Sequence, residues 1–356
     1  MHITSIEVQP LNLELQTALT VAYGSYPELN YALLKIFTDD GLLGLGEASP
    51  DPEVTGETQA SVIAALQQAV PFLVGNDPFD IEHILTLCLE KIPAYPAAIA
   101  AIDMALYDLM GQSLHIPAYQ LLGGKSRPSM TLYPVIPLDE PQTMAGISKN
   151  FVDRGATTLK IKLGSSPDTD LLRLENIYNA VGDSVKFRLD INQGWKDSRT
   201  SIQTIQSLDK FNIEWIEQPV AANDLDGLAE VTATVDIPIM ADESCHSPAD
   251  VLKIACQHAA DMINIKLMKC GGLYQAAKML AVAEAAGLPC ILGSMGESSI
   301  GSAAGLHFVT ANRGILACEL IGPLFINNDP ATGYQVDMAT FQAIPSEKPG
   351  LGVQLK

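Results

Sequence analysis

Basic residues are scarce in this chain, which carries 21 lysines and arginines against 41 aspartates and glutamates. The net charge of −20 argues against a nucleic acid or an anionic membrane surface as partner, because both select basic surfaces. No apolar run approaches membrane-spanning length, and the N-terminus lacks the pattern of a signal peptide. We therefore expect a small-molecule partner, with no nucleic acid and no membrane.

Cysteine is also sparse, and its spacing excludes the usual patterned sites. The cysteines form no Cys-x-x-Cys pair and no zinc-type spacing, and most fall in or beside apolar segments. Buried reduced thiols are the default for such residues. This pattern favours a cytoplasmic protein.

The first 324 residues show two different patterns of apolar and polar residues, which indicate two domains. Residues 1–50 alternate apolar and polar side chains, which predicts an antiparallel sheet, and residues 57–122 have helical periodicity. We assign residues 1–125 to an α+β domain. Residues 126–324 form the second domain, in which strands and helices alternate as in a (β/α) barrel. Residues 325–356 are expected to pack back on the first domain. The predicted barrel strands are 130–136, 157–163, 185–191, 213–217, 238–241, 261–266, 288–293 and 315–320.

Charged residues close or follow five successive apolar strands at intervals of 24 to 28 residues: Lys162, Asp190, Glu217, Asp242 and Lys266. Such intervals correspond to one strand-plus-helix unit. The charges therefore recur at the same end of consecutive strands, which is the catalytic face of a closed parallel barrel.

The three acids Asp190, Glu217 and Asp242 are candidate metal ligands. Mg²⁺ prefers oxygen ligands, and carboxylates from three adjacent strand ends would supply one face of its octahedron. A single acid at such a place would more simply cap the following helix. Three acids at the same point of consecutive units favour the metal site.

Lys160 and Lys162 lie two residues apart in one apolar strand, so their side chains share a face. We expect each ammonium group to lower the pKa of the other, which would suit a general base. Lys266 ends a strand four units later, on the opposite side of the barrel. The plainer alternative is that these are surface lysines at strand ends. However, a strand buried on both faces rarely carries an unpartnered lysine.

Together these residues suit the removal of a proton from carbon next to a carboxylate. A metal would bind the carboxylate and stabilise the resulting enediolate. Two lysines on opposite faces could remove the proton on one face and return it on the other, inverting the stereocentre. One lysine alone would support elimination or cycloisomerisation.

The strings KIK, LDIN, IEQP, ADES and NIKLMKCGG resemble the enolase superfamily, in the subgroup of muconate-lactonizing enzymes. The resemblance covers essentially the whole chain. It implies a modified TIM barrel, (β/α)₇β, under an α+β capping domain, and one Mg²⁺ per subunit. It also implies these roles: Asp190, Glu217 and Asp242 as Mg²⁺ ligands, Lys162 and Lys266 as bases, Lys160 as the group that tunes Lys162, and Asn192 and Glu243 as supporting residues.

Within the subgroup, GEASP, VTGET and GSMGESS are most similar to dipeptide epimerases of the L-Ala-D/L-Glu type. Those enzymes usually carry Asp-x-Asp at the end of strand eight to hold the free ammonium of the dipeptide. Glu319 can replace the first aspartate here, but Ile321 cannot replace the second. The string ELIGPL instead resembles muconate cycloisomerases. The substrate contacts implied by the resemblance are Tyr23, Thr55, Glu297, Ser298, Glu319 and Ile321.

We therefore expect a Mg²⁺-dependent isomerase that epimerises a dipeptide or a related carboxylate. A muconate-type cycloisomerase and an N-acylamino acid racemase on the same scaffold remain alternatives. A Schiff-base lyase and a non-catalytic binding barrel are further alternatives. The oligomeric state, including a homo-oligomer, stays open.

Overall fold

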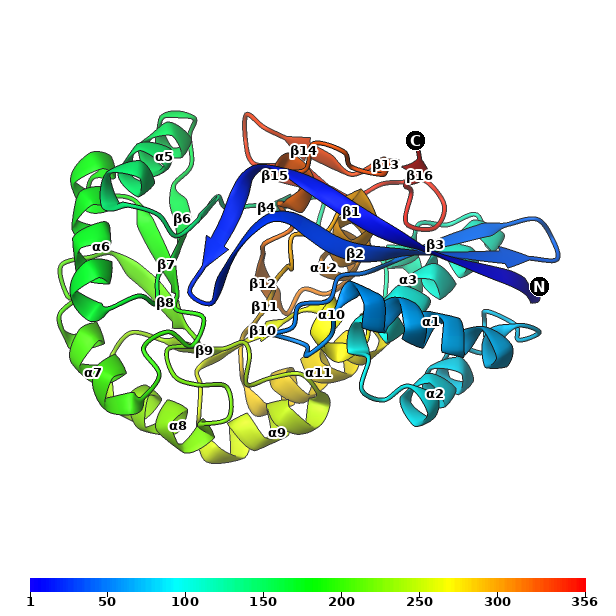
Figure 1. The fold of residues 1–356 in the computed structure, drawn as a ribbon, viewed down its shortest axis with the longest axis horizontal. Coiled ribbons are helices and arrows are strands. Elements are labelled where there is room, and N and C mark those ends of the chain that lie inside the picture. The colour runs from blue at the N-terminus through cyan, green and yellow to red at the C-terminus, as the bar shows by residue number, and fades with distance from the viewer.

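A three-stranded antiparallel sheet begins the chain in the computed structural model, which describes residues 1–356. Strands β1 (Ile3–Val21), β2 (Gly24–Thr38) and β3 (Leu43–Ala48) pair in that order. The alternation of apolar and polar residues predicted this sheet. Figure 1 shows that the β1–β2 hairpin is much longer than β3 and extends away from the N-terminal helices toward the barrel strands.

Four helices complete the capping domain, and two of them, α1 and α3, pack against this sheet. The four are α1 (Gln59–Leu73), α2 (Ile81–Lys91), α3 (Pro96–Ser113) and the short α4 (Ala118–Leu121). Helix α3 is buried on all sides, and its small residues allow β3 to approach closely. A Cβ atom on Gly46 would lie 1.9 Å from the carbonyl oxygen of Ala101, so only glycine fits this contact.

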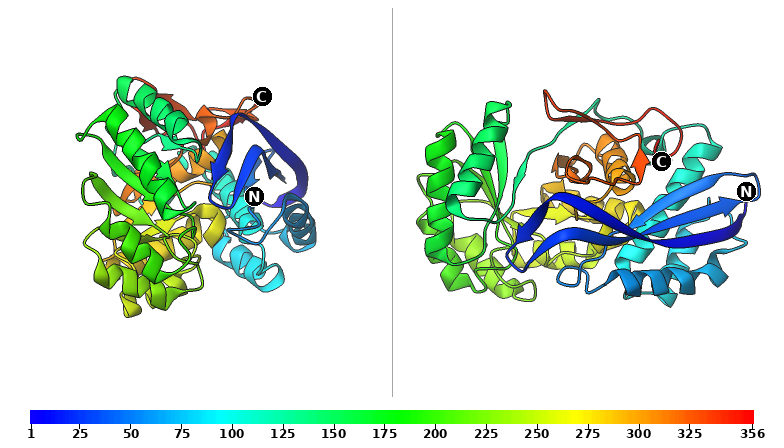
Figure 2. Two further views of the ribbon diagram at one scale, coloured as in Figure 1. Left: turned by 60° about the vertical axis from the view of Figure 1, so that its left-hand side comes forward. Right: turned by 45° about the horizontal axis from the view of Figure 1, so that its top comes forward.

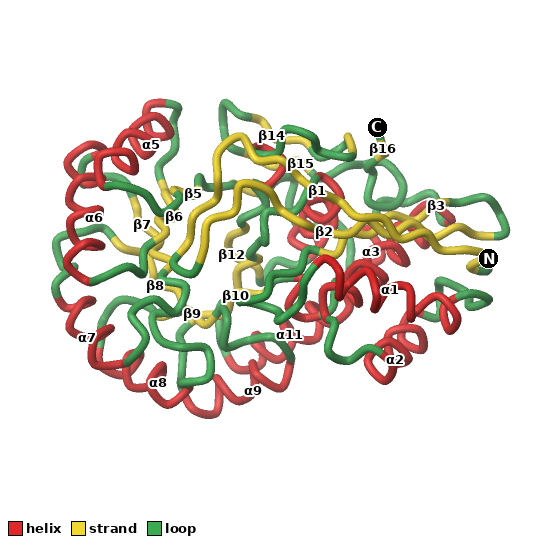
Figure 3. The backbone as a smooth tube through the Cα atoms, viewed as in Figure 1, coloured by secondary structure: helices red, strands yellow, loops and turns green.

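Eight parallel strands form the curved sheet of the barrel, in sequence order from β5 to β12. The predicted alternation of strand and helix is thus confirmed, and Figure 3 shows the yellow strands inside an arc of red helices. The strands are β5 (Val135–Ile136), β6 (Thr158–Lys162), β7 (Lys186–Asp190), β8 (Ile213–Glu217), β9 (Ile239–Ala241), β10 (Met262–Ile265), β11 (Cys290–Leu292) and β12 (Ile315–Cys318).

The helices that follow these strands cover the outside of the barrel. They are α5 (Pro141–Asp153), α6 (Pro167–Val181), α7 (Ser198–Gln206), α8 (Leu225–Thr234), α9 (Pro248–Gln257), α10 (Leu267–Cys270), α11 (Leu273–Ala286) and α12 (Ser299–Ala311). None of the helices in the structure is both long enough and apolar enough to cross a membrane.

The first predicted barrel strand, 130–136, is interrupted in the structure. Residues Met130–Thr131 form β4, which pairs outside the barrel, and only β5 pairs with β6. Between them, Leu132 makes a parallel bridge to Cys318 and so connects the two edges of the barrel sheet. Pro134 has no N–H to donate, which explains why one continuous strand does not form.

The last residues contact both domains. After a short 3₁₀ helix, Gly322–Leu324, residues 325–327 bond to β1: the N–H of Gln16 donates to Phe325 O at 2.8 Å, and the N–H of Asn327 donates to Glu14 O at 2.8 Å. Figure 2 shows this red segment against the blue hairpin in two further views. The remaining short strands are β13 (Ala331–Thr332), β14 (Gln335–Asp337), β15 (Gln342–Ile344) and β16 (Gln354–Leu355).

Candidate active site

A cavity of about 710 Å³ lies between the β1–β2 hairpin and the carboxyl ends of the barrel strands. Its floor includes three of the predicted lysines, Lys160, Lys162 and Lys266, and its roof comes from the hairpin and the loop after β3. A second hollow of about 800 Å³, between α9 and α11, contains none of the predicted site residues. The cavity under the hairpin is therefore the candidate active site.

The three predicted metal ligands lie together under this cavity and are completely buried. Asp190 ends β7, Glu217 ends β8 and is its direct register partner, and Asp242 follows β9. Burial raises the pKa of Asp190, but Lys160 and Lys162 outweigh this effect and hold it below its usual value. Burial and the charge of Asp190 raise the pKa of Glu217 well above its usual value. Negative charge is thus concentrated at this point.

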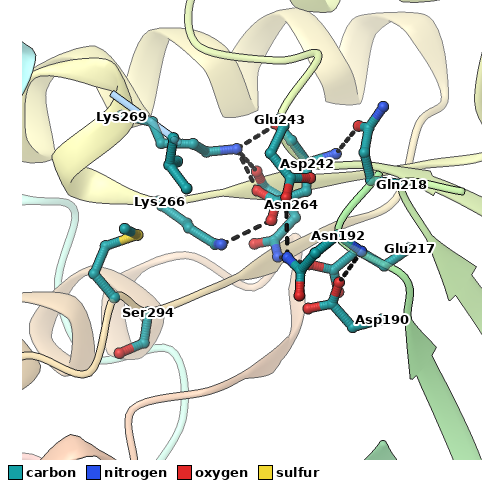
Figure 4. A network of polar contacts seen from close by, with 12 residues as sticks. Asp190, Asn192, Glu217, Gln218, Asp242, Glu243, Asn264, Lys266, Lys269 and Ser294 are labelled. Carbon is teal, nitrogen blue, oxygen red and sulfur yellow. Dashed lines mark hydrogen bonds and ion pairs between the residues drawn. The ribbon is translucent and has the colours of Figure 1, made fainter. Parts of the chain in front are cut away.

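One oxygen of each carboxylate is held by a neighbouring polar group. Oδ1 of Asp190 accepts from the N–H of Asn192 at 3.1 Å, and Oε1 of Glu217 accepts from Asn264 at 2.9 Å. Oδ1 of Asp242 accepts from Lys269 at 2.5 Å. Figure 4 shows this network around the strand ends. The three side chains are therefore fixed before any ligand arrives.

Three carboxylates surround the ammonium group of Lys160. The sequence-based prediction that its pKa is lowered is wrong. Its Nζ is 2.8 Å from Asp190, 2.8 Å from Glu217 and 2.7 Å from Glu319. Burial would lower the pKa of Lys160, but these three charges raise it well above its usual value. Lys160 is thus a fixed cation of the site.

Lys162 and Lys266 face the cavity from strands on opposite sides of the barrel, as the sequence predicted. Nζ of Lys162 donates to Oδ2 of Asp190 at 2.6 Å and to Oδ1 of Asn192 at 3.0 Å. Nζ of Lys266 donates to Oδ2 of Asp242 at 2.7 Å. Burial would lower the pKa of Lys266, but Asp242 outweighs it and the pKa is raised. Each lysine therefore pairs with a different candidate metal ligand.

Asn192 and Glu243, the two predicted supporting residues, connect the two halves of the network. The amide of Asn192 donates to Oε1 of Glu243 at 2.9 Å, while its oxygen accepts from Lys162. Burial, followed by the charges of Asp242 and Asp190, raises the pKa of Glu243 to about 7. Its second oxygen, Oε2, is buried without a hydrogen-bond partner.

The donor chemistry of this site fits a hard divalent cation. In this structure no group of three or more acidic, histidine or cysteine side chains is arranged to hold a metal ion. The carboxylate oxygens instead face lysine ammonium groups. The network nevertheless holds one more carboxylate than ammonium groups, and it includes an unpartnered buried oxygen on Glu243. A divalent cation would turn this excess negative charge into a positive charge suited to a carboxylate ligand. Asp190, Glu217 and Asp242 are the residues that would hold it.

At the end of β12 the structure places Glu319 and Ile321 on the cavity wall. Oε1 of Glu319 accepts from Lys160 at 2.7 Å and from the hydroxyl of Tyr133 at 3.1 Å. Ile321 is 9% exposed and offers only an aliphatic surface.

Two of the predicted contacts come from the capping domain, and only one of them reaches the cavity. Tyr23, in the turn of the hairpin, lines the cavity, and its pKa is raised by burial and then by the charges of Asp51 and Glu243. Thr55 does not line the cavity; its hydroxyl donates to the carbonyl of Asp51 at 3.1 Å. Pro50, Asp51 and Pro52 are the residues of this loop that line the cavity.

Glu297 and Ser298 lie just behind the cavity wall. Glu297 accepts from the hydroxyl of Ser294 and from the N–H of Met295, and these two residues line the cavity. Ser298 is fully buried and caps helix α12. Its N–H donates to Glu47 of β3 at 3.0 Å, and its hydroxyl donates to the same carboxylate. The structure thus gives Ser298 a contact with the capping domain.

Three further residues of this region, Lys269, Asn264 and Glu47, were not predicted from the sequence. Lys269 follows Lys266 by three residues, and helical spacing returns it to the same side of the chain. That spacing could have identified it. Asn264 and Glu47 lack such a signal, because their roles depend on partners from distant segments.

Comparisons with known proteins agree with this geometry. Residues 3–123 match the N-terminal domain of the mandelate racemase/muconate lactonizing enzymes, and residues 144–356 match the enolase C-terminal domain-like family. The N-succinyl-L-Arg/Lys racemase of Bacillus cereus is 38% identical over 100% of this chain and 96% of its own length. The hydrophobic dipeptide epimerase of Enterococcus faecalis is 40% identical over 94% of each chain.

A comparison with a solved structure shows the same relationship at the level of the fold. The dipeptide epimerase from Enterococcus faecalis, in complex with Mg and the dipeptide L-Leu-L-Tyr, superposes with a TM-score of 0.95 at 38% identity. The superposition covers 99% of this chain and 100% of that one. By sequence and by fold, the chain belongs to the mandelate racemase/muconate lactonizing enzyme family of the enolase superfamily.

Proposed function

We propose that this protein is a Mg²⁺-dependent epimerase that inverts the α-carbon of a dipeptide or a related N-acylated amino acid. The observation that carries this proposal is the pair Lys162 and Lys266, which reach one cavity from opposite sides of three buried carboxylates. In a dipeptide, the α-carbon next to the free carboxylate bears an amide nitrogen. Dipeptides and N-acyl amino acids therefore present the same reacting group.

The residues of the chain define where the substrate lies. The substrate carboxylate belongs near Asp190, Glu217 and Asp242, where Mg²⁺, when bound, stabilises the negative charge left by the departing α-proton. The α-carbon then lies between Lys162 and Lys266. One lysine in its amine form accepts the proton on one face. The other, as an ammonium group, donates a proton on the opposite face.

The roof of the cavity isolates this reaction from water. Tyr23, Tyr26 and Tyr31 of the hairpin line the cavity above the lysines. A site with little water strengthens the interactions of the ammonium groups with the developing carbanion. The hairpin also connects to the cavity floor, because the hydroxyl of Tyr31 donates to the carbonyl of Met295 at 2.5 Å.

Proton exchange in deuterium oxide tests the proposal. We expect NMR to show that the α-proton of a dipeptide or N-acyl amino acid from a substrate panel exchanges for deuterium as the stereocentre inverts, and that chelation of Mg²⁺ stops both processes. Lactone formation from a muconate, without α-proton exchange in the panel, would instead support the cycloisomerase alternative.

We also propose a cytoplasmic setting for this enzyme. All six cysteines are unpaired, and five of them are buried, which suits a reducing compartment. A thiol titration of the unfolded protein, purified without reductant under argon, should find all six cysteines free.

A further inference from the structure

Asp242 lies beyond the strand pairing that places the other two acids. Asp190 and Glu217 are direct register partners at the ends of β7 and β8. The pairing between β8 and β9 ends at Glu217 and Met240, so Asp242 follows two residues after the last residue of β9 that pairs with β8. Pairing with β8 therefore does not fix Asp242 relative to Glu217, and another contact has to hold it there.

The side chain of Gln218 supplies this contact. The N–H of Gln218 donates to Met240 O at 2.9 Å. If the parallel pairing continued, the N–H of Asp242 would donate to the main-chain carbonyl of Gln218. That carbonyl instead accepts from the N–H of Gln193, in the segment after β7, at 2.8 Å. The N–H of Asp242 donates to the side-chain Oε1 of Gln218 at 3.0 Å, a bond drawn in Figure 4. The side-chain amide thus replaces the main-chain carbonyl of the same residue.

Every hydrogen-bonding position of this amide is occupied. Oε1 of Gln218 also accepts from the N–H of Ser244 at 3.1 Å, while Nε2 donates to Val220 O at 3.1 Å and to the hydroxyl of Ser244 at 2.7 Å. Because Asp242 and Ser244 both offer an N–H, the oxygen of the amide has to face them, which fixes its orientation. The side chain is completely buried. It therefore braces the segments after β8 and β9 against each other.

Strained backbone marks the same region. Seven residues other than glycine have a left-handed φ, and four of them lie in the segments after β7 and β8: Asn192, Gln193, Lys196 and Gln218. This conformation is costly for a residue with a Cβ atom, and it persists where surrounding contacts fix it. Gln218 has a φ of +39°. Gln193, with a φ of +68°, accepts at its Oε1 from the N–H of Ala222 at 2.8 Å. The segments after β7, β8 and β9 are thus cross-linked by two glutamines.

We infer that Gln218 is a positioning residue of the metal site, because its side chain extends the pairing of β8 and β9 and so fixes Asp242 beside Glu217. Gln218 does not line the cavity, and it acts through these two acids. Mg²⁺ requires a nearly ideal octahedral arrangement of oxygen ligands, so a shift of one carboxylate weakens its binding. The inference rests on the proposed function, in which Asp190, Glu217 and Asp242 hold Mg²⁺.

Replacement of Gln218 by methionine tests this role. Gln218→Met nearly keeps the volume of the side chain but leaves the N–H of Asp242 without its acceptor. We expect the dissociation constant for Mg²⁺ to rise by at least about tenfold. The measurement is titration calorimetry with magnesium chloride and no substrate, at a temperature where circular dichroism shows that the variant is folded. At saturating Mg²⁺ the rate of α-proton exchange should return to within about threefold of the wild-type rate, because Lys162 and Lys266 are unchanged.

Gln193→Met is the matched control. Gln193 is also a glutamine with a left-handed φ, and its side-chain oxygen accepts from one main-chain N–H, that of Ala222. Ala222 is not a candidate metal ligand, so the dissociation constant for Mg²⁺ should stay within about threefold of the wild-type value.

Ser244→Ala provides a second test. It removes the hydroxyl that holds the amide of Gln218 and leaves Gln218 and the three acids in place. The amide is then less firmly oriented, and the dissociation constant for Mg²⁺ should rise by at least about threefold.

The outcomes separate the inference from the proposed function. An unchanged Mg²⁺ affinity in Gln218→Met, or in Ser244→Ala if Gln218→Met does not fold, would overturn the inference and leave the proposed function standing. An equal loss of affinity in Gln193→Met would also overturn it, because any break between these segments would then weaken Mg²⁺ binding. Absence of Mg²⁺ binding by the wild-type protein would overturn the proposed function and the inference with it.

Discussion

At the scale of single residues, Asp242 is held by two lysines that use different oxygens. Lys266 contacts Oδ2 and faces the cavity, whereas Lys269 contacts Oδ1 and is completely enclosed. Lys269 also donates to the carbonyl of Asn264 at 3.1 Å. It therefore fixes the carboxylate from behind, while Oδ2 of Asp242 faces Lys266 and the cavity.

Replacing Lys269 tests this positioning role. In Lys269→Met the carboxylate of Asp242 loses its rear partner, and we expect the dissociation constant for Mg²⁺ to rise by about 10- to 100-fold, as measured by calorimetry without substrate. Lys253→Met is the matched control, because Lys253 is an exposed lysine paired to Asp250. An unchanged Mg²⁺ affinity in Lys269→Met would show that Lys269 serves stability alone.

Periodicity in the sequence was sufficient to predict where the charged residues lie, but not how they pair. Asp190 and Glu217 are direct register partners at adjacent strand ends, and Asp242 lies two residues beyond Met240, the register partner of Glu217. The pKa of Lys160 was predicted in the wrong direction. Three carboxylates lie within 2.8 Å of its Nζ, and one of them, Glu319, comes from a segment 159 residues away in the chain. Local spacing carries no information about such a contact.

At the scale of elements, the loop after β11 is fastened to the capping domain. Tyr31 of β2 bonds to Met295, and Glu47 of β3 accepts from Ser298 and from the N–H of Gly301 at the start of α12. The loop that lines the cavity and the sheet that supports its roof are thus joined by buried hydrogen bonds. Displacement of one element would move the other.

Ser298→Ala separates this role from direct substrate contact. Loss of the cap and of the bond to Glu47 should lower the free energy of unfolding by about 1–2 kcal/mol and raise KM more than it lowers kcat. Ser166→Ala removes the cap of the outer helix α6 and is the matched control, which should lose stability with KM unchanged. If Ser298→Ala keeps full stability and loses only activity, Ser298 contacts the substrate instead.

Strand boundaries were predictable where a single apolar run makes up the strand. They were not predictable where neighbouring residues pair with different strands. The eight barrel strands follow from repeated apolar runs, whereas the split of residues 130–136 depends on Pro134 and on a bridge from Leu132 to Cys318. The 19-residue length of β1 was also unpredicted, because its end projects over the barrel and has no core of its own.

At the scale of the whole molecule, three buried carboxylates tie the capping domain to the rest of the chain, and a fourth, Glu57, joins two segments within the capping domain. Glu47 bonds to α12, Asp103 bonds to the first N–H groups of α11, and Asp108 bonds to Leu351. Glu57 accepts from the N–H of Ala97 at the start of α3. Burial raises the pKa of Glu47 and Glu57 to about 7, that of Asp103 to about 8 and that of Asp108 to about 6.

Because of these four carboxylates, we expect the free energy of unfolding to fall as pH rises from 6.5 to 8. Each folded-state pKa exceeds the unfolded value near 4, so the folded protein holds protons that the unfolded chain has released. The free energy of unfolding should drop by on the order of 3 kcal/mol over this window. The window stops at 6.5 because the pKa of His246 and that of His307 are lowered to about 4 by burial, which opposes the trend at lower pH.

Urea unfolding of the metal-free protein at several pH values measures this slope. Asp103→Asn should flatten it most, because Asp103 has the highest of the four pKa values. Stability that rises between pH 6.5 and 8 would mean that hydrogen bonds to the four carboxylates keep them ionised despite burial.

The proposed epimerisation depends on two lysines that act on opposite faces of one carbon. The most direct test is α-proton exchange of each separate substrate enantiomer in deuterium oxide, with wild type, Lys162→Ala and Lys266→Ala. We predict that both variants lose inversion by at least about 100-fold. Each variant should still exchange the α-proton of only one enantiomer, and the two variants should differ in which one. Inversion at the wild-type rate by Lys266→Ala would contradict the account.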